Sequence, residues 1–220
     1  MSLTDTIIQY KKENILVICF NKPKKKNALD SNMYQEVKEI FQKATTDDEI
    51  AAVVITGTGN FYSSGNDLSY IPKTDEEYLE FMKVLRNFIR AFIVFPKILI
   101  ALVNGPAVGI AATSLPLCDL VLASDNALEM LLFNYKLSAK EALECGFINY
   151  VYKHDEFQIK AWDKIKEITE LPTIPMFATK KLIRHQIQEQ LLKINDKELQ
   201  KIIQIKTNRL MKFENENSKL

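Results

Sequence analysis

The sequence predicts an α/β fold that ends in a helical region. Three patterns indicate this fold: short apolar runs rich in β-branched residues, amphipathic stretches between them, and a long charged amphipathic stretch that follows. The first two patterns alternate over residues 1–153, and the third occupies residues 154–217. The chain has 220 residues, of which 47% are hydrophobic, so it is long enough for one domain with a buried core.

Six segments have the composition expected of β-strands. The first two are separated by a polar turn at residues 11–14. The third and fourth are continuously apolar, as in strands that are covered on both faces. The predicted strands are residues 6–9, 15–20, 50–56, 97–103, 120–123 and 147–152.

Capping residues and apolar stripes predict the helices. Asp30, Ser31 and Asn32 offer N-caps for a helix whose apolar residues recur on one face. Ser138 and Glu141 form a capping box for a later helix, which Gly146 closes. The other predicted helices are about residues 75–92, a helix that starts after 104–106, and residues 156–213 with an interruption at 171–175.

Composition argues against several classes of function. A net charge of +1 gives no bulk electrostatic reason to expect a nucleic-acid or membrane partner. Three cysteines without a C-x-x-C pair and two scattered histidines predict neither a disulfide framework nor a metal site, and no cofactor is expected. The apolar stretch 91–124 is broken by proline, glycine and charged residues, so no membrane span is expected, and no secretory signal is evident.

Two glycine motifs suggest a site for a negatively charged oxygen. Ser64-Gly65-Asn66-Asp67-Leu68 follows a predicted strand, and Gly105-Pro106-Ala107-Val108-Gly109-Ile110 follows another and opens a helix. Glycine allows positive φ and close approach of a ligand, and N–H groups at such turns and at helix starts have no partner within the helix. Two such donors stabilise an enolate or a tetrahedral oxyanion. Either motif alone is also compatible with an ordinary structural turn.

Further motifs surround these two in a fixed order. Asn21-Lys22-Pro23 precedes Lys24-Lys25-Lys26-Asn27-Ala28, and Cys118-Asp119 begins a strand after the second glycine motif. The whole ordered series covers residues 21–28, 53–57, 61–68, 96–110, 118–125 and 137–148. It resembles the enoyl-CoA hydratase/isomerase (crotonase) family over most of the chain, and within that family it is most similar to the peroxisomal Δ3,Δ2-enoyl-CoA isomerases.

The resemblance implies a crotonase-like ββα spiral core with a C-terminal helical region, and a role in unsaturated fatty acid β-oxidation. It implies that the N–H groups of Asn66 and Ile110 bind the oxygen of an acyl-CoA thioester. The remaining implied substrate-binding residues are Ser64, Gly65, Asp67, Leu68 and Gly109, with Lys24, Lys25, Lys26 and Ala28 beside the nucleotide end of CoA. The three lysines are also compatible with a solvated basic loop or a short nuclear-localisation signal.

One part of the family pattern is missing. In the family, the catalytic acid/base glutamate lies in a segment that follows the Cys-Asp-Leu-Val strand, whereas here residues 125–126 run directly into 127–132. The gap amounts to roughly 30 residues, about one strand and one helix. Loss of that unit predicts exposed apolar surface and an uncovered sheet edge.

Other carboxylates are poor substitutes for the missing glutamate. Glu129 is the least implausible, whereas Glu141 and Glu144 have the pattern of capping and solvated residues, and Asp67 and Asp119 resemble structural positions. We therefore expect an impaired enoyl-CoA isomerase. The alternatives are a non-catalytic acyl-CoA-binding or oligomer-modulating pseudoenzyme and, last, a hydratase or thioesterase.

The C-terminal region carries two more expectations. Ser218-Lys219-Leu220 matches a signal that the peroxisomal import receptor reads, so the peroxisomal matrix is the expected location. The charged amphipathic helices of residues 154–217 suit packing on a neighbouring subunit, and the family resemblance implies a homotrimer or a hexamer.

Overall fold

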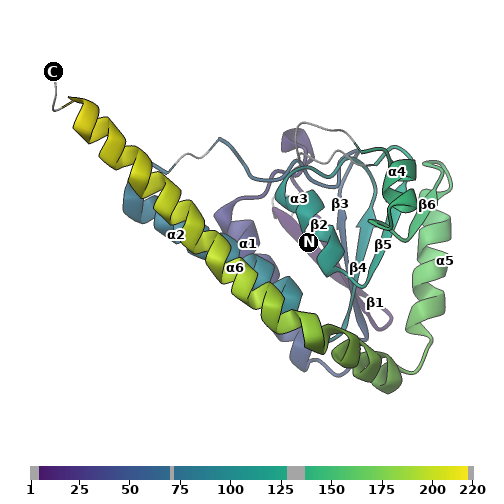
Figure 1. The fold of residues 1–220 in the computed structure, drawn as a ribbon. Helices are drawn as coiled ribbons and strands as arrows, with labels where there is room; N and C mark the ends of the chain where they lie inside the picture. The colour runs from purple at the N-terminus through teal and green to yellow at the C-terminus, as the bar shows by residue number, and fades with distance from the viewer. Residues whose placement is uncertain (1–4, 70–71, 128–136, 218–220) are drawn as a thin grey trace.

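The computed structural model describes the backbone of residues 5–69, 72–127 and 137–217, and side chains as far as residue 205. A six-stranded sheet forms the centre, with the strands in sequence order (Figure 1). The first pair is antiparallel and the other neighbours are parallel. The strands are β1 (Ile7–Lys12), β2 (Ile15–Phe20), β3 (Ala52–Gly57), β4 (Ile98–Val103), β5 (Leu120–Ser124) and β6 (Tyr150–Tyr152).

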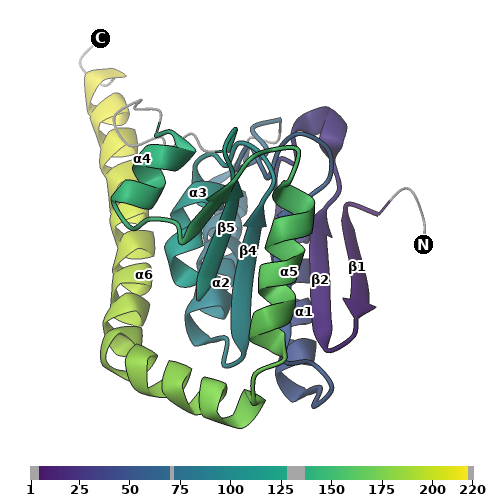
Figure 2. The ribbon, with the colours of Figure 1, turned by 90° about the vertical axis from the view of Figure 1, so that its right-hand side faces the viewer.

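Helices cover both faces of the sheet, as the continuously apolar strands predict (Figure 2). On one face lie α1 (Ser31–Thr46) and α2 (Asp75–Val94), and on the other lies α5 (Phe157–Thr169). Alternate residues of β3 point to the two layers: Val53 packs with the α1 and α2 cluster, and Val54 with the α5 cluster. The remaining elements are η1 (Pro23–Lys25), α3 (Ile110–Thr113), η2 (Leu115–Leu117), α4 (Ala139–Glu144) and α6 (Thr173–Asn217).

The last helix, α6, runs beside α2 and is fixed at two places (Figure 1). Near its start, Lys180 and Arg184 bind Asp119, which precedes β5, at 2.6 and 3.3 Å. Further along, the buried side chain of Asn195 donates to the carbonyl oxygen of Arg86 in α2 at 3.0 Å. These contacts hold α6 on the domain instead of leaving it a free extension.

The capping predictions are confirmed. Asp30 accepts from the N–H of Met33 at 3.0 Å, and the apolar stripe of α1 is buried. Ser138 and Glu141 form the capping box of α4, and Gly146 follows that helix with a φ of 74°.

Several predicted boundaries differ from the structure, and two of them have a clear cause. The turn after β1 begins at Glu13 instead of residue 11, because Lys11 and Lys12 still pair with β2. The strand predicted at residues 147–152 is only Tyr150–Tyr152, because the N–H groups of Phe147 and Ile148 bind the carbonyl oxygen of Ala142 and close α4.

The outermost strand on this side of the sheet is β6, which pairs with Leu122, Ala123 and Ser124 of β5. The predicted junction lies just beyond this ladder, and Glu129 falls outside the described residues, as do Ser218, Lys219 and Leu220. In the described part of the chain, no helix has the length and apolarity to cross a membrane.

Candidate oxyanion site

The two glycine motifs meet at the carboxyl ends of β3 and β4. Ser63 and Ala107 form an isolated parallel bridge, in which the N–H of Val108 donates to the carbonyl oxygen of Ser63 at 2.9 Å. A Cβ atom added to Gly65 would lie only 2.6 Å from the carbonyl oxygen of Val108. Only glycine allows this approach, so the two loops lie side by side.

Each expected donor follows a glycine with positive φ. Asn66 follows Gly65, whose φ is 81°, and Ile110 follows Gly109, whose φ is 57°. Among the residues that the structure describes, neither the N–H of Asn66 nor that of Ile110 has a protein acceptor. Two N–H groups without a protein acceptor therefore lie on adjoining turns.

The helix that Ile110 opens is shorter than the sequence suggests. It comprises four residues, Ile110–Thr113, and passes into the short η2. A single turn has almost no macrodipole, so the N–H group of Ile110 itself, and not a helix field, is what this element offers an oxygen.

Two buried asparagines hold the loop before the first glycine motif. Asn27 donates to the carbonyl oxygens of Thr58 and Phe61 at 2.9 and 2.7 Å. Asn104 donates to the carbonyl oxygen of Gly59 at 2.8 Å. Sequence reasoning did not give these asparagines a role, although Asn27 sits in the left-handed region with a φ of 55°, which asparagine tolerates well.

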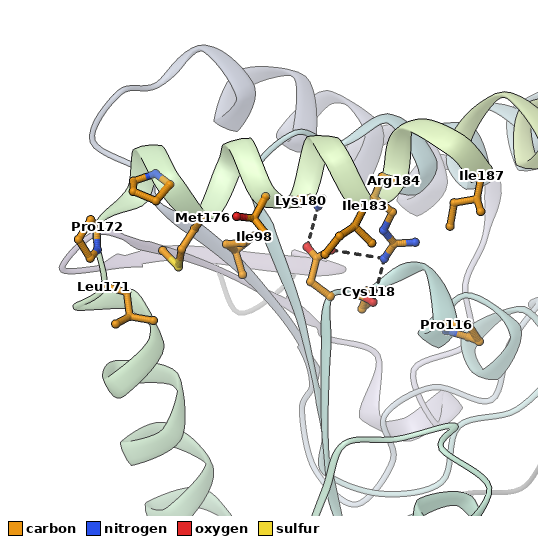
Figure 3. A pocket seen from close by; sticks show the side chains of 13 residues that line it. Ile98, Pro116, Cys118, Leu171, Pro172, Met176, Lys180, Ile183, Arg184 and Ile187 are labelled. Atoms are coloured by element: carbon orange, nitrogen blue, oxygen red, sulfur yellow. Dashed lines mark hydrogen bonds and ion pairs between the residues drawn. The ribbon is translucent and has the colours of Figure 1, made fainter.

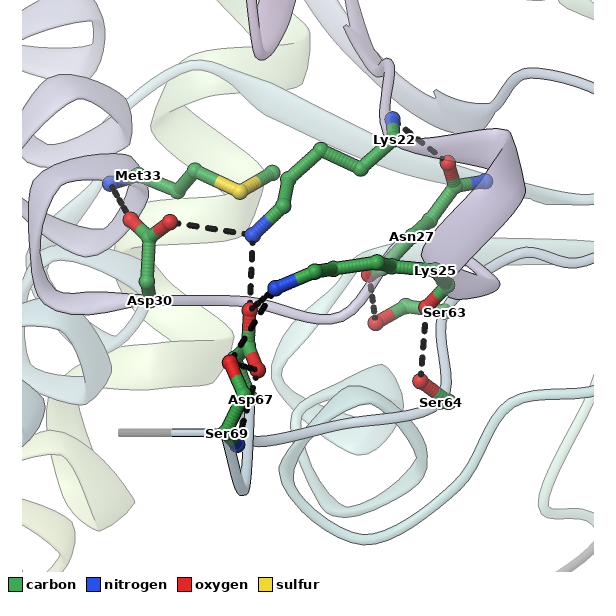
Figure 4. Close-up of polar contacts among 9 residues, drawn as sticks. All are labelled: Lys22, Lys25, Asn27, Asp30, Met33, Ser63, Ser64, Asp67 and Ser69. Atoms are coloured by element: carbon green, nitrogen blue, oxygen red, sulfur yellow. Dashed lines mark hydrogen bonds and ion pairs between the residues drawn. The ribbon is translucent and has the colours of Figure 1, made fainter. Parts of the chain in front are cut away.

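A cluster of charges lies next to the first glycine motif (Figure 4). Lys22 binds both Asp67 and Asp30, at 2.9 and 3.0 Å, and Lys25 binds Asp67 at 3.2 Å. Hydrogen bonds from Ser69 and then from Lys22 hold the pKa of Asp67 well below its usual range. Burial lowers the pKa of Lys22, but its bonds to Asp67 and Asp30 outweigh burial and raise it. Asp67 is therefore a permanent anion with a structural partner, unsuited to proton transfer near neutral pH.

The basic loop of residues 24–28 lies against the first glycine motif, and only some of its side chains are available for a ligand. The N–H of Ser64 donates to the carbonyl oxygen of Lys26 at 2.9 Å, and Ala28 is buried. Lys25 is committed to Asp67, whereas Lys24 and Lys26 have no carboxylate partner among the described residues. The ammonium group of Lys26 instead lies over the ring of Phe61, 5.1 Å from its centroid. Leu68, the last residue of the first glycine motif, has 82% of its surface exposed.

The described carboxylates that were weighed as substitute bases have other partners. Glu141 caps α4, and Glu144 lies 3.9 Å from Lys140. Asp119 accepts from the N–H of Leu99 at 2.8 Å as well as from Lys180 and Arg184. Desolvation lowers the pKa of Lys180 despite this pairing. Asp119 is thus an anchor for α6, as its sequence position suggested.

The cavities lie mostly away from the glycine turns. A groove of about 680 Å³ runs below α6 at the amino end of β4, where Ile98, Asp119 and Ile183 line it (Figure 3). A cavity of only about 50 Å³ reaches Ile110 and is walled by α2 and α6. The residues that line this larger groove include none of the two glycine motifs. In the described residues, no group of three or more potential ligands could hold a metal ion.

Known proteins resemble this chain over most of its length. Enoyl-CoA delta isomerase 2 of Homo sapiens is 37% identical over 229 aligned residues, which cover 88% of this chain and 58% of that protein. Enoyl-CoA delta isomerase 3, peroxisomal, of Mus musculus is 36% identical, with coverage of 87% and 71%. The chain thus spans little more than half the length of the human relative.

Solved structures show the same fold. An enoyl-CoA hydratase/isomerase from Xanthobacter autotrophicus Py2 superposes with a TM-score of 0.84 at 23% identity, covering 91% of this chain and 87% of that one. An enoyl-CoA hydratase from Bacillus halodurans gives 0.82 at 22% identity, covering 90% and 94%. These likenesses show the crotonase fold with its C-terminal helical region. Residues 10–128 match the sequence model of the enoyl-CoA hydratase/isomerase family. The chain belongs to the enoyl-CoA hydratase/isomerase family.

Proposed function

We propose that this chain binds an acyl-CoA thioester through the N–H groups of Asn66 and Ile110, as a protein of enoyl-CoA delta isomerase type whose catalysis is impaired. The observation that carries the proposal is the contact between Gly65 and Val108, which sets the two unpaired donors on adjoining turns. The names of the human and mouse relatives support the choice of substrate class.

Isomerisation requires an acid/base that the described site lacks. Moving a double bond from position 3 to position 2 requires removal of a proton from C2 and delivery of one to C4. The enolate thioester formed in between carries its charge on the oxygen that Asn66 and Ile110 bind, and two such donors stabilise it by several kcal/mol. A base near the hole is still required, and the described carboxylates weighed for that role are engaged elsewhere.

Two features of the comparisons support a missing internal segment. The alignment with the human relative has 229 positions but uses 88% of 220 residues, which is about 194, so about 35 positions have no residue here. The family match stops at residue 128, beside the predicted junction. A strand and helix of that size is the unit in which the family's acid/base is expected.

A non-catalytic acyl-CoA-binding or oligomer-modulating protein is the second candidate, and the same engaged carboxylates favour it. Two measurements test the acyl-CoA site and the lack of turnover that both candidates share: calorimetric titration with octanoyl-CoA against CoA alone, and a conjugation assay with a 3-enoyl-CoA beside an active isomerase. We expect tighter binding of octanoyl-CoA than of CoA and no turnover above the buffer rate. Turnover would overturn the claim of impairment, and equal or absent binding would overturn the site.

We further propose a peroxisomal location and self-association through α6. The name of the mouse relative and Ser218-Lys219-Leu220 support the location. A fluorescent protein fused to the N-terminus should enter peroxisomes only when these three residues are kept, and import without them would contradict the proposal. For self-association, the support is an apolar stripe of Ile183, Ile187, Ile194 and Ile205, which recur at helical spacing and are all exposed.

A further inference from the structure

A buried tyrosine contacts the side chain of the first oxyanion donor. Tyr34 lies in the first turns of α1 and is 1% exposed, with its ring against Phe88 of α2 at a centroid distance of 4.7 Å. Its hydroxyl donates a hydrogen bond to Oδ1 of Asn66. Desolvation raises the pKa of Tyr34, so the phenol keeps the proton that this bond uses.

The backbone around Asn66 is fixed by the segment that leads into α1. The N–H of Leu29 donates to the carbonyl oxygen of Gly65 at 2.8 Å, and the N–H of Asp67 donates to the carbonyl oxygen of Leu29 at 2.8 Å. These bonds hold the residues on either side of Asn66. They do not restrain the Asn66 side chain, whose amide oxygen is free to turn about χ1 unless another group binds it.

If Oδ1 of Asn66 were unrestrained, it would weaken binding of an oxygen at these turns. Asparagine side chains bind nearby main-chain N–H groups readily, so a free Oδ1 competes for the donors of this turn. A lone pair turned toward the bound oxygen would also repel the negative charge that develops there. A donor that occupies Oδ1 removes both effects, and the phenol of Tyr34 is that donor.

We propose that Tyr34 is a positioning residue that keeps Oδ1 of Asn66 away from the oxyanion hole. The proposal rests on the proposed function, because it concerns the same two donors. Tyr34 itself is buried, with 1% of its surface exposed. It acts only through the side chain of Asn66, and this makes the proposal testable by a double-mutant cycle.

The cycle uses Tyr34→Phe, Asn66→Ala and the double variant in the full chain. Asn66→Ala keeps the main-chain N–H and removes the oxygen that Tyr34 holds. Octanoyl-CoA labelled at its carbonyl carbon is the probe, and the readouts are its infrared carbonyl stretch and its dissociation constant. We expect Tyr34→Phe to move the stretch toward its value in water and to weaken binding about twofold to tenfold. The same substitution should change neither readout in the Asn66→Ala background.

Phe88→Leu is the matched control, because it loosens the packing of the Tyr34 ring and keeps the hydroxyl. It should lower the melting temperature while leaving the carbonyl stretch as in the wild type. If Tyr34→Phe also alters only the melting temperature, or alters the stretch equally with and without Asn66, Tyr34 is not a positioning residue. If the wild type itself leaves the carbonyl stretch unshifted, the proposed function fails instead, so the two failures are distinguishable.

Discussion

Replacing Gly65 with alanine separates the two glycine turns, and its cost follows from the structure. A φ of 81° costs a residue with a side chain about 1–2 kcal/mol. The new Cβ would also lie 2.6 Å from the carbonyl oxygen of Val108, which is main chain and can move only with the second turn. Overpacking of this kind adds about 1–3 kcal/mol. We therefore expect Gly65→Ala to reduce the free energy of unfolding by about 2–5 kcal/mol.

Gly146→Ala provides the matched control. Gly146 has a similar φ of 74°, but an added Cβ would meet nothing within 4 Å. Gly146→Ala should therefore reduce the free energy of unfolding only by the cost of the positive φ, about 1–2 kcal/mol. Urea unfolding measures both variants, and titration with octanoyl-CoA should show binding lost in Gly65→Ala and kept in Gly146→Ala. Equal destabilisation, or unchanged binding by Gly65→Ala, would refute the contact between the turns.

Three further predictions follow from the charges and from α6. Asp67→Asn should lower the free energy of unfolding at neutral pH. The folded-state pKa of Asp67 is depressed below 3.8, so the carboxylate stabilises the fold above that pH and loses this effect as the pH falls. In urea unfolding, the difference in free energy between variant and wild type should therefore shrink below about pH 4. A difference that does not change with pH would contradict the stabilising role of the ion pairs of Asp67 with Lys22 and Lys25. Asp119→Ala leaves Lys180 buried without its anion and should cost about 3–5 kcal/mol in the same assay, whereas a loss below 1 kcal/mol would mean that α6 is anchored otherwise. Ile183→Glu with Ile194→Glu changes side chains that are 67% and 59% exposed, so light scattering should report monomers with an unchanged melting temperature, and unaltered oligomers would exclude this stripe as the interface.

The sequence was sufficient where a local pattern decides the structure. The buried stripe of α1 follows from helical spacing, and the capping box of α4 from Ser138 and Glu141. The meeting of the two glycine turns was implied by the family resemblance. Neither motif contains that information alone, because the bridge between Ser63 and Ala107 joins segments far apart in the chain.

The missed features are contacts between distant residues. Asn27 and Asn104 hold the same loop from two distant segments of the chain, and Tyr34 reaches Asn66 from α1. Side chains of these types are common at the surface, so nothing in their spacing marks them as buried. The start of β6 was misplaced for a related reason: Phe147 looks like a strand residue, but its N–H closes α4.

The carbonyl stretch of bound octanoyl-CoA tests the central claim most directly, because it reports the hydrogen bonds made to the thioester oxygen itself. With the carbonyl carbon labelled, the wild-type protein should shift the stretch below its value in water, and Gly65→Ala should abolish the shift. A bound thioester whose carbonyl stretch equals that of the free compound would contradict the assignment of Asn66 and Ile110 as its two donors.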